Sequence, residues 1–113
     1  MSKREPRFLV EDILESASKI YTYTQGLSFE NSIKDSKTID AVVRNFEFIG
    51  EAANRLPEDL KNKYNHIDWN RIKRFRNRIV HEYFGIDYSI LWQIKETYLS
   101  EMVVQLKQIS SNS

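Results

Sequence analysis

The sequence predicts an all-α protein: a small up-and-down bundle of four to five helices in a single domain. Its 113 residues are the usual length of one domain. Only three glycines and two prolines interrupt the chain, and apolar residues recur at steps of three and four residues, as in amphipathic helices. We expect the domain to cover residues 1–113, with a disordered Ser/Asn tail from about residue 110 to 113.

Composition excludes several classes of protein. The chain is 41% hydrophobic and 29% charged, a balance typical of soluble globular domains. No apolar run approaches the roughly 18 residues of a membrane span, and the charged N-terminus lacks the apolar segment of a secretion signal. The absence of cysteine excludes disulfides, thiolate metal sites and cysteine nucleophiles. These features favour a cytoplasmic protein that does not enter a membrane.

The first half of the chain predicts two long helices. The first ends before Gly26, a residue that commonly terminates helices, and residues 27–35 form a connection with one helical turn near Phe29. Ser36 is the predicted N-cap of the second long helix. Pro57 ends this helix and opens a short one that reaches Tyr64. The predicted core positions of the two long helices are Leu9, Ile13, Ala17, Ile20 and Thr24, then Ile39, Val43, Phe46, Ile49, Ala53 and Leu56.

The second half predicts two further long helices. Asp68 is placed to cap a helix from Trp69 to Phe84, Gly85 ends it, and Asp87 caps the last helix. That last helix is apolar over more than one face, which is typical of a helix that contacts a partner or a second copy of the chain. Its main stripe contains Leu91, Ile94, Tyr98, Met102, Leu106 and Ile109, and its second stripe contains Trp92, Leu99 and Val103.

The net charge of +1 conceals an uneven distribution. Residues 1–60 carry a net charge of −3, residues 61–84 carry +5, and residues 85–113 carry −1. Two interpretations fit this basic stretch: an ordinary solvated helix face, or a patch that faces a polyanion.

The third long helix contains residues suited to phosphate chemistry. At about 100° per residue, Arg76 lies about 20° from Tyr83 at the edge of the core-facing side, whereas Asn77 and His81 lie about 100–140° further round. Histidine transfers protons near neutral pH, and a guanidinium matches the geometry of phosphate. This set suits RNA cleavage by a 2′-hydroxyl, with His81 moving a proton, Arg76 stabilising charge on the phosphate and Asn77 positioning the groups.

The reaction needs both a base and an acid, but this helix has one histidine. A two-fold dimer with its motifs facing each other would supply a second His81. His66 lies in a predicted loop, where a solvated or capping role is expected. No set of residues has the spacing of a metal site, so neither a metal nor another cofactor is expected. The same spacing also fits a structural histidine with arginine and asparagine nearby by chance.

Two further groups of charged residues lie near the motif in the predicted bundle. Arg44, Glu47, Glu51 and Arg55 recur at helical spacing, which fits salt bridges within one helix, or a role for Glu47 or Glu51 in orienting Arg76 from a neighbouring helix. No third ligand accompanies the two carboxylates, so a metal is not indicated. The second group is basic and should attract the RNA backbone without sequence preference; it consists of Arg71, Lys73, Arg74 and Arg78.

The motif resembles the signature of a known superfamily. Arg76 and His81 match the Arg-x4-His pattern of HEPN proteins, and Tyr83 extends it to the Arg-x4-His-x-Tyr of the HepT-like branch. The run from Val43 to Ala53, with its Gly-Glu-Ala-Ala end, also resembles that branch. So do Ile67-Asp68-Trp69, the segment from Tyr83 to Asp87, and Leu91-Trp92, so that the resemblance covers about residues 7–109.

This resemblance implies a dimerising helical bundle with its motifs at the subunit cleft. It implies a metal-independent endoribonuclease that acts as the toxin of a toxin–antitoxin pair. The implied partner is a small nucleotidyltransferase (MNT-type) antitoxin, which transfers AMP to the motif tyrosine, here Tyr83. An AMP group close to Arg76 would compete with RNA phosphate. Tyr83 also fits a core tyrosine whose hydroxyl lies at the rim.

Two other functions fit the same residues. The first is a binding module, in which a catalytically silent bundle presents a nucleotide or substrate to a minimal nucleotidyltransferase. The second is a helical dimer in which the motif is only structural.

Overall fold

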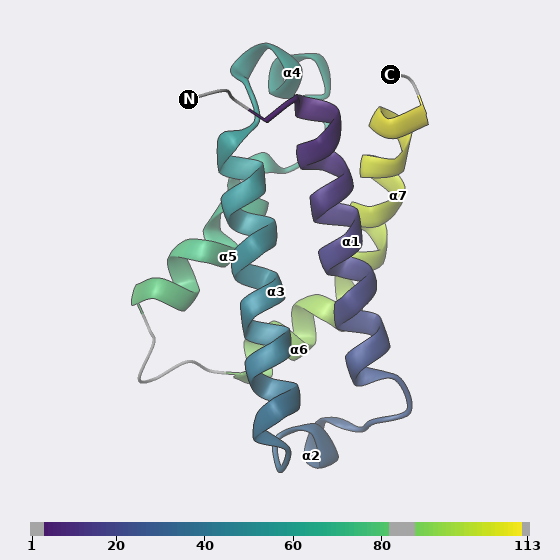
Figure 1. Ribbon diagram of the computed structural model, residues 1–113, viewed down its shortest axis with the longest axis vertical. Helices are drawn as coiled ribbons and strands as arrows, with labels where there is room; N and C mark the ends of the chain where they lie inside the picture. Colours follow the sequence, from purple (N-terminus) through teal and green to yellow (C-terminus); the bar gives the residue numbers. More distant parts are fainter. Residues whose placement is uncertain (1–3, 82–87, 112–113) are drawn as a thin grey trace.

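The structure is a computed structural model that describes residues 4–81 and 88–111, with only the backbone described for residues 76–81. All the regular structure in these ranges is helical, which confirms the predicted fold class (Figure 1). The described helices are α1 (Pro6–Thr24), α2 (Phe29–Ser32), α3 (Ser36–Arg55), α4 (Glu58–Lys63), α5 (Trp69–His81), α6 (Tyr88–Thr97) and α7 (Leu99–Ser111).

Helix α3 occupies the centre of the bundle. It packs against α1 on one side and α5 on the other, and α1 packs in turn against α7. Figure 1 shows α1 and α3 antiparallel, with the short helices α2 and α4 at opposite ends of the bundle. Helix α5 leaves the α4 end and diverges from α3 along its length. The positions of Arg76 and His81, the two predicted catalytic residues, therefore belong to an outer helix.

The predicted features of α1 are confirmed. All five predicted core positions of this helix are buried. After the helix ends, Gly26 has a φ of 77°, in the left-handed region that a residue without Cβ adopts at little cost. The predicted helical turn near Phe29 is present as α2, whose N-cap Ser28 accepts a hydrogen bond from the Asn31 amide.

The predicted N-cap of the second long helix is one residue too late. Asp35 caps α3, and Ser36 is the first helical residue. The Asp35 carboxylate accepts hydrogen bonds from the Lys37 amide at 3.1 Å and from the Thr38 hydroxyl at 2.8 Å. The Asp35 carboxylate accepts hydrogen bonds from two donors here. Its negative charge is also stabilised by the positive end of the helix dipole, an interaction that an uncharged serine hydroxyl lacks.

Asp68 caps α5 as predicted. Its carboxylate accepts a hydrogen bond from the Arg71 amide at 3.0 Å, and its carbonyl accepts one from the Ile72 amide. The indole of Trp69 donates to the Tyr64 carbonyl and ties the first turn of α5 to the end of α4. The predicted end of this helix, from residue 82 to Gly85, and the predicted cap at Asp87 lie outside the described residues.

The last predicted helix is divided in two at Tyr98. The Tyr98 amide donates to the Ile94 carbonyl, and the Met102 amide donates to the Tyr98 carbonyl. One residue earlier, the Thr97 hydroxyl donates to the Gln93 carbonyl at 2.8 Å, a type of side-chain bond that often bends helices. Helix α7 continues to Ser111, two residues past Ile109, the last residue of the predicted stripe.

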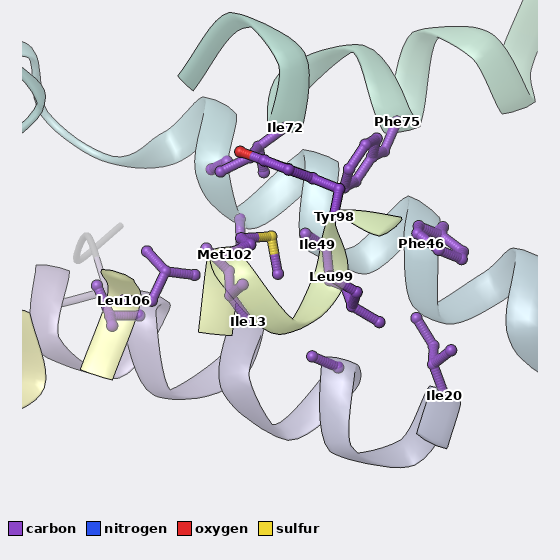
Figure 2. Close-up of a cluster of buried hydrophobic side chains, with 14 of the residues drawn as sticks. Ile13, Ile20, Phe46, Ile49, Ile72, Phe75, Tyr98, Leu99, Met102 and Leu106 are labelled. Carbon is purple, nitrogen blue, oxygen red and sulfur yellow. The ribbon is translucent and has the colours of Figure 1, made fainter. Parts of the chain in front are cut away.

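The hydrophobic core joins α5 to the rest of the bundle (Figure 2). Phe75 of α5 packs edge-on against Phe46 of α3, with ring centres 5.3 Å apart, and lies 6.5 Å from the ring of Tyr98. Ile72 is also fully buried. The Tyr98 hydroxyl is buried and has no hydrogen-bond partner among the described residues. No helix among the described residues combines the length and the hydropathy that a membrane crossing requires.

Candidate functional site

Helix α5 carries the predicted catalytic positions. Arg76, Asn77 and His81 all belong to its continuous backbone. Five residues separate Arg76 from His81, so they lie about 7.5 Å apart along the axis and about 140° apart around it. The side chains from Arg76 to His81, Arg78 included, and the whole of Tyr83 lie outside the described residues. The helical backbone thus places the arginine and the histidine on different sides of one helix.

Arg71, one of the predicted RNA-backbone residues, has a fixed position. Its guanidinium carbon lies 3.8 Å from the centre of the Tyr98 ring, a cation–π contact. The Tyr98 side chain is itself buried in the core. Arg71 is therefore attached to a rigid platform and does not extend freely into solvent.

A groove of about 320 Å³ separates α5 from α6 and contains two of the four predicted basic residues. Within residues 4–81 and 88–111, no carboxylate forms an ion pair with Arg71 or Arg74. The two positive charges are thus available to an anion. The lining residues are Arg71, Arg74 and Phe75 from α5 and Ile90, Gln93, Ile94 and Thr97 from α6.

Lys73 lies on a different surface from the two arginines. It lines a polar hollow of about 500 Å³ beside the α4–α5 connection, together with Lys61, Asn62 and His66. The His66 side chain is exposed, with its ring centre 6.4 Å from that of Tyr64. The three basic side chains of α5 that the structure describes, Arg71, Lys73 and Arg74, are therefore distributed over two hollows.

The acidic residues of α3 occupy different environments. Glu47 directly follows Phe46, which contacts α5, and its side chain is half-buried. Glu51 lines a hollow of about 320 Å³ between α1 and α3 with Lys19 and Arg55. The predicted ladder of salt bridges is absent: in this fully described helix no ion pair joins any two of Arg44, Glu47, Glu51 and Arg55.

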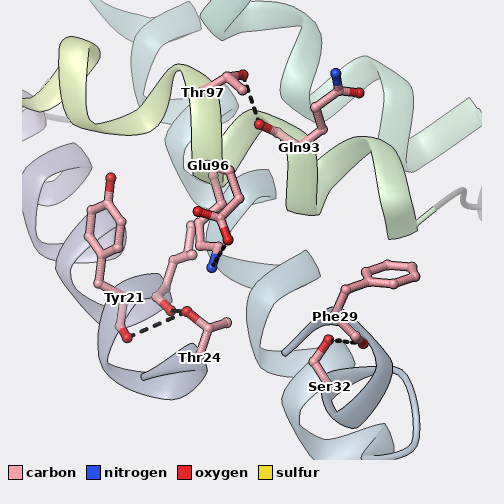
Figure 3. A network of polar contacts seen from close by, with 9 residues as sticks. Tyr21, Thr24, Phe29, Ser32, Gln93, Glu96 and Thr97 are labelled. Atoms are coloured by element: carbon pink, nitrogen blue, oxygen red, sulfur yellow. Dashed lines mark hydrogen bonds and ion pairs between the residues drawn. The ribbon is translucent and has the colours of Figure 1, made fainter. Parts of the chain in front are cut away.

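The polar groups of α6 complete the groove. Figure 3 shows the Gln93 side-chain amide extending from α6 near Thr97, whose hydroxyl bonds the Gln93 carbonyl. Gln93 and Thr97 recur at a four-residue spacing, as do Ile90 and Ile94. No signal in the sequence distinguishes these groove residues from an ordinary helix surface, because Arg71, which lines the same groove, lies on another helix.

A further hollow in the described part of the chain, of about 680 Å³, lies elsewhere. It is formed by the end of α1 with α6 and α7, and its lining includes Tyr21, Lys95, Val103 and Lys107. Among the predicted site residues whose side chains the structure describes, none lines it. The Lys95 ammonium is paired with the Glu96 carboxylate at 3.1 Å and lies 3.6 Å from the centre of the Trp92 ring, so its charge already has a partner.

Metal chemistry has no evident site. Among residues 4–81 and 88–111, no three histidine, aspartate or glutamate side chains lie together as metal ligands would. The arrangement places Arg71 and Arg74 on the same helix as the positions of Arg76 and His81, and arginine and histidine are residue types that suit the binding and cleavage of a phosphodiester.

Comparison with known proteins agrees with this chemistry. The model of a family described as "Ribonuclease HepT-like" matches residues 13–109. A protein of Methanocaldococcus jannaschii named "Putative RNase MJ0127" is 38% identical over 96% of this chain and 90% of its own length. The "Probable ribonuclease HepT" of Thermococcus cleftensis is 39% identical over 83% of this chain and 86% of its own. No solved structure gives a significant match.

Proposed function

This chain belongs to the ribonuclease HepT-like family, and on that basis we propose that it is a metal-independent endoribonuclease whose catalytic residues are Arg76 and His81. The supporting observation is that both residues lie in the continuous backbone of α5, on the C-terminal side of Arg71 and Arg74, two arginines that have no ion-pair partner among the described residues. The residues proposed for polyanion binding and for proton transfer thus lie on the same helix.

The proposed reaction is attack of a ribose 2′-hydroxyl on the adjacent phosphorus. His81 removes the proton of the 2′-hydroxyl as the bond between that oxygen and phosphorus forms. The bond from phosphorus to the 5′-oxygen breaks, and this oxygen takes a proton from an acid. Arg76 stabilises the charge that accumulates on the phosphate oxygens. The products are a 2′,3′-cyclic phosphate and a 5′-hydroxyl end.

A homodimer supplies the second proton-transfer group in this proposal. Because Arg76 and His81 lie about 140° apart around α5, one copy of the helix does not direct both toward one phosphate. A two-fold interface across α5 brings the same residues from a second copy into the cleft. Asn77 lies on the His81 side of the helix and positions the phosphate. Glu47 lies on α3, directly after the residue that contacts α5, and orients Arg76.

The proposed partner is an MNT-type nucleotidyltransferase antitoxin. It transfers AMP to the hydroxyl of Tyr83, with release of pyrophosphate from ATP. Tyr83 follows Arg76 by seven positions in the sequence, a spacing that corresponds to about 20° around an ideal helix, and on this basis we propose that the added negative charge competes with RNA for that arginine. The chain is then the toxin of a toxin–antitoxin pair, and Tyr83→Phe should remove the mass increase of one AMP group after incubation with the antitoxin and ATP.

A cleavage assay in EDTA tests the nuclease. Wild-type protein should cleave single-stranded RNA and leave cyclic phosphate ends, whereas Arg76→Ala and His81→Ala should each cleave at least about 100-fold more slowly. His66→Ala is the matched control, because that histidine is exposed and lies on another surface; it should cleave normally. Equal cleavage by wild type and His81→Ala, or none by either, removes the nuclease and leaves the binding module.

A further inference from the structure

We propose that the groove between α5 and α6 is a nucleotide-binding subsite, which holds one nucleotide of the RNA strand beside the scissile phosphate. Arg71 and Arg74 bind its phosphate, and apolar lining residues with Gln93 receive its base. This inference rests on the proposed ribonuclease function and adds to it a site from α6, a helix outside the motif.

The charges of the groove select an anion. Arg71 and Arg74 have no carboxylate partner in the described part of the chain. Arg71 is held against Tyr98 at 3.8 Å, so little side-chain freedom remains to be lost when an anion binds. Guanidinium groups bind phosphate oxygens through two parallel hydrogen bonds. Arg71 and Arg74 together therefore form a phosphate site in which the Arg71 side chain is already ordered.

The rest of the lining suits a base. The buried Phe75 and the half-buried Ile94 contribute apolar surface to a lining that is otherwise mainly polar. Apolar surface of this kind accepts the face of any base without sequence preference. The Gln93 amide offers a donor and an acceptor at the wall of the same groove. The volume of about 320 Å³ lies at the lower end of the range for small-ligand pockets, which suits one nucleotide.

The groove is aligned with the proposed catalytic histidine. Arg74 and His81 are seven residues apart on α5, which places them within about 20° of one face and about 10.5 Å apart along the axis. A strand whose phosphate is bound at Arg74 can therefore continue along the same face toward His81. Lys73, at about 100° from Arg74, belongs to the other hollow and is not part of this subsite.

Binding can be measured without cleavage in the His81→Ala background. The probe is a fluorescent single-stranded oligoribonucleotide, and its anisotropy is followed over a range of salt concentrations. Arg74→Ala should weaken binding roughly tenfold and reduce the slope of log affinity against log salt by about 0.7. Ile94→Trp, which fills the groove and changes no charge, should weaken binding and leave the slope unchanged. Arg7→Ala, an exposed arginine on α1, is the matched control and should change neither.

A second measurement locates the base. Oligoribonucleotides that carry one 4-thiouridine at successive positions are irradiated with the protein, and the crosslinked peptides are identified by mass spectrometry. One position should crosslink to the segment 90–97. Crosslinks spread over the surface, or equal loss of binding in Arg74→Ala and Arg7→Ala, overturn the subsite. If wild type fails to cleave RNA but Arg74→Ala still loses binding, the nuclease proposal fails and the subsite stands.

Discussion

The guanidinium carbon of Arg71 lies over the Tyr98 ring, 3.8 Å from its centre, although the two residues come from α5 and from the junction between α6 and α7. Tyr98 is 4% exposed and its ring also contacts Phe75 edge-on. A cation on the surface is thus held by an aromatic ring of the core. The position of Arg71 depends on core packing as much as on its own helix.

Removing the Tyr98 ring should therefore weaken RNA binding without any loss of charge. In the His81→Ala background, we expect Tyr98→Leu to raise the dissociation constant of a single-stranded oligoribonucleotide by about 2- to 25-fold, since cation–π contacts contribute about 0.5–2 kcal/mol. Tyr98→Phe retains the ring and should bind normally. Circular dichroism checks that both variants are folded; equal affinities of folded Leu and Phe variants would show that the ring does not position Arg71.

Two phenylalanines of α3 should differ sharply in their contribution to stability. Phe46 is fully buried against Phe75, whereas Phe48 is 48% exposed. We expect Phe46→Ala to lower the free energy of unfolding by about 3–5 kcal/mol, and Phe48→Ala to change it by about 0.5 kcal/mol. Urea denaturation followed by circular dichroism measures both. Similar losses in the two variants would contradict the placement of α3 against α5.

Alkaline pH should destabilise the fold. Burial raises the pKa of Tyr98 and of Tyr88 above the usual tyrosine value near 10. In the unfolded chain these hydroxyls ionise near pH 10, while in the folded protein they still hold their protons, so stability is lost as pH rises from about 10 through the folded pKa. Urea midpoints at pH 8 and above pH 10 measure this loss, and Tyr98→Phe should lose less. An equal loss in wild type and Tyr98→Phe would count against burial of this hydroxyl.

The cap of α3 should make stability sensitive to acid. Hydrogen bonds from the Thr38 hydroxyl, then from the Thr38 and Lys37 amides, lower the pKa of Asp35 below its usual value. Its contribution is therefore present above about pH 4 and is lost as pH falls through the folded pKa. Asp35→Ala should lower the melting temperature at pH 7, whereas Asp35→Asn retains a cap and should change it less. Ser36→Ala serves as the control and should melt like wild type.

Local signals in the sequence were sufficient for most of the helices. The stop at Gly26 and the cap at Asp68 depend on short-range hydrogen bonds and backbone conformation, so the residue types alone indicate them. The choice between Asp35 and Ser36 was not decidable in this way, because both are good caps. The division at Tyr98 was hidden because Tyr98 lies within an unbroken apolar stripe.

The candidate site was predictable only in part. The positions of Arg76, His81 and Tyr83 were assigned by pattern and by resemblance, and their roles remain predictions. The grouping of Arg71 and Arg74 with α6, and the separation of Lys73 from them, required the three-dimensional packing of two helices. A contact such as Arg71 with Tyr98 joins residues far apart in the chain, and no local spacing encodes it.

The bend at Tyr98 has a mechanical consequence for the groove. Helix α6 forms one wall of that groove, and α7, beyond the bend, is fixed to α1 through buried Leu99, Met102 and Leu106. Because closely packed interiors transmit strain, the angle between α6 and α7 determines the width of the groove between α6 and α5. Substitutions that change the packing of α7 against α1 would thus change the width of the groove without replacing any of its lining residues.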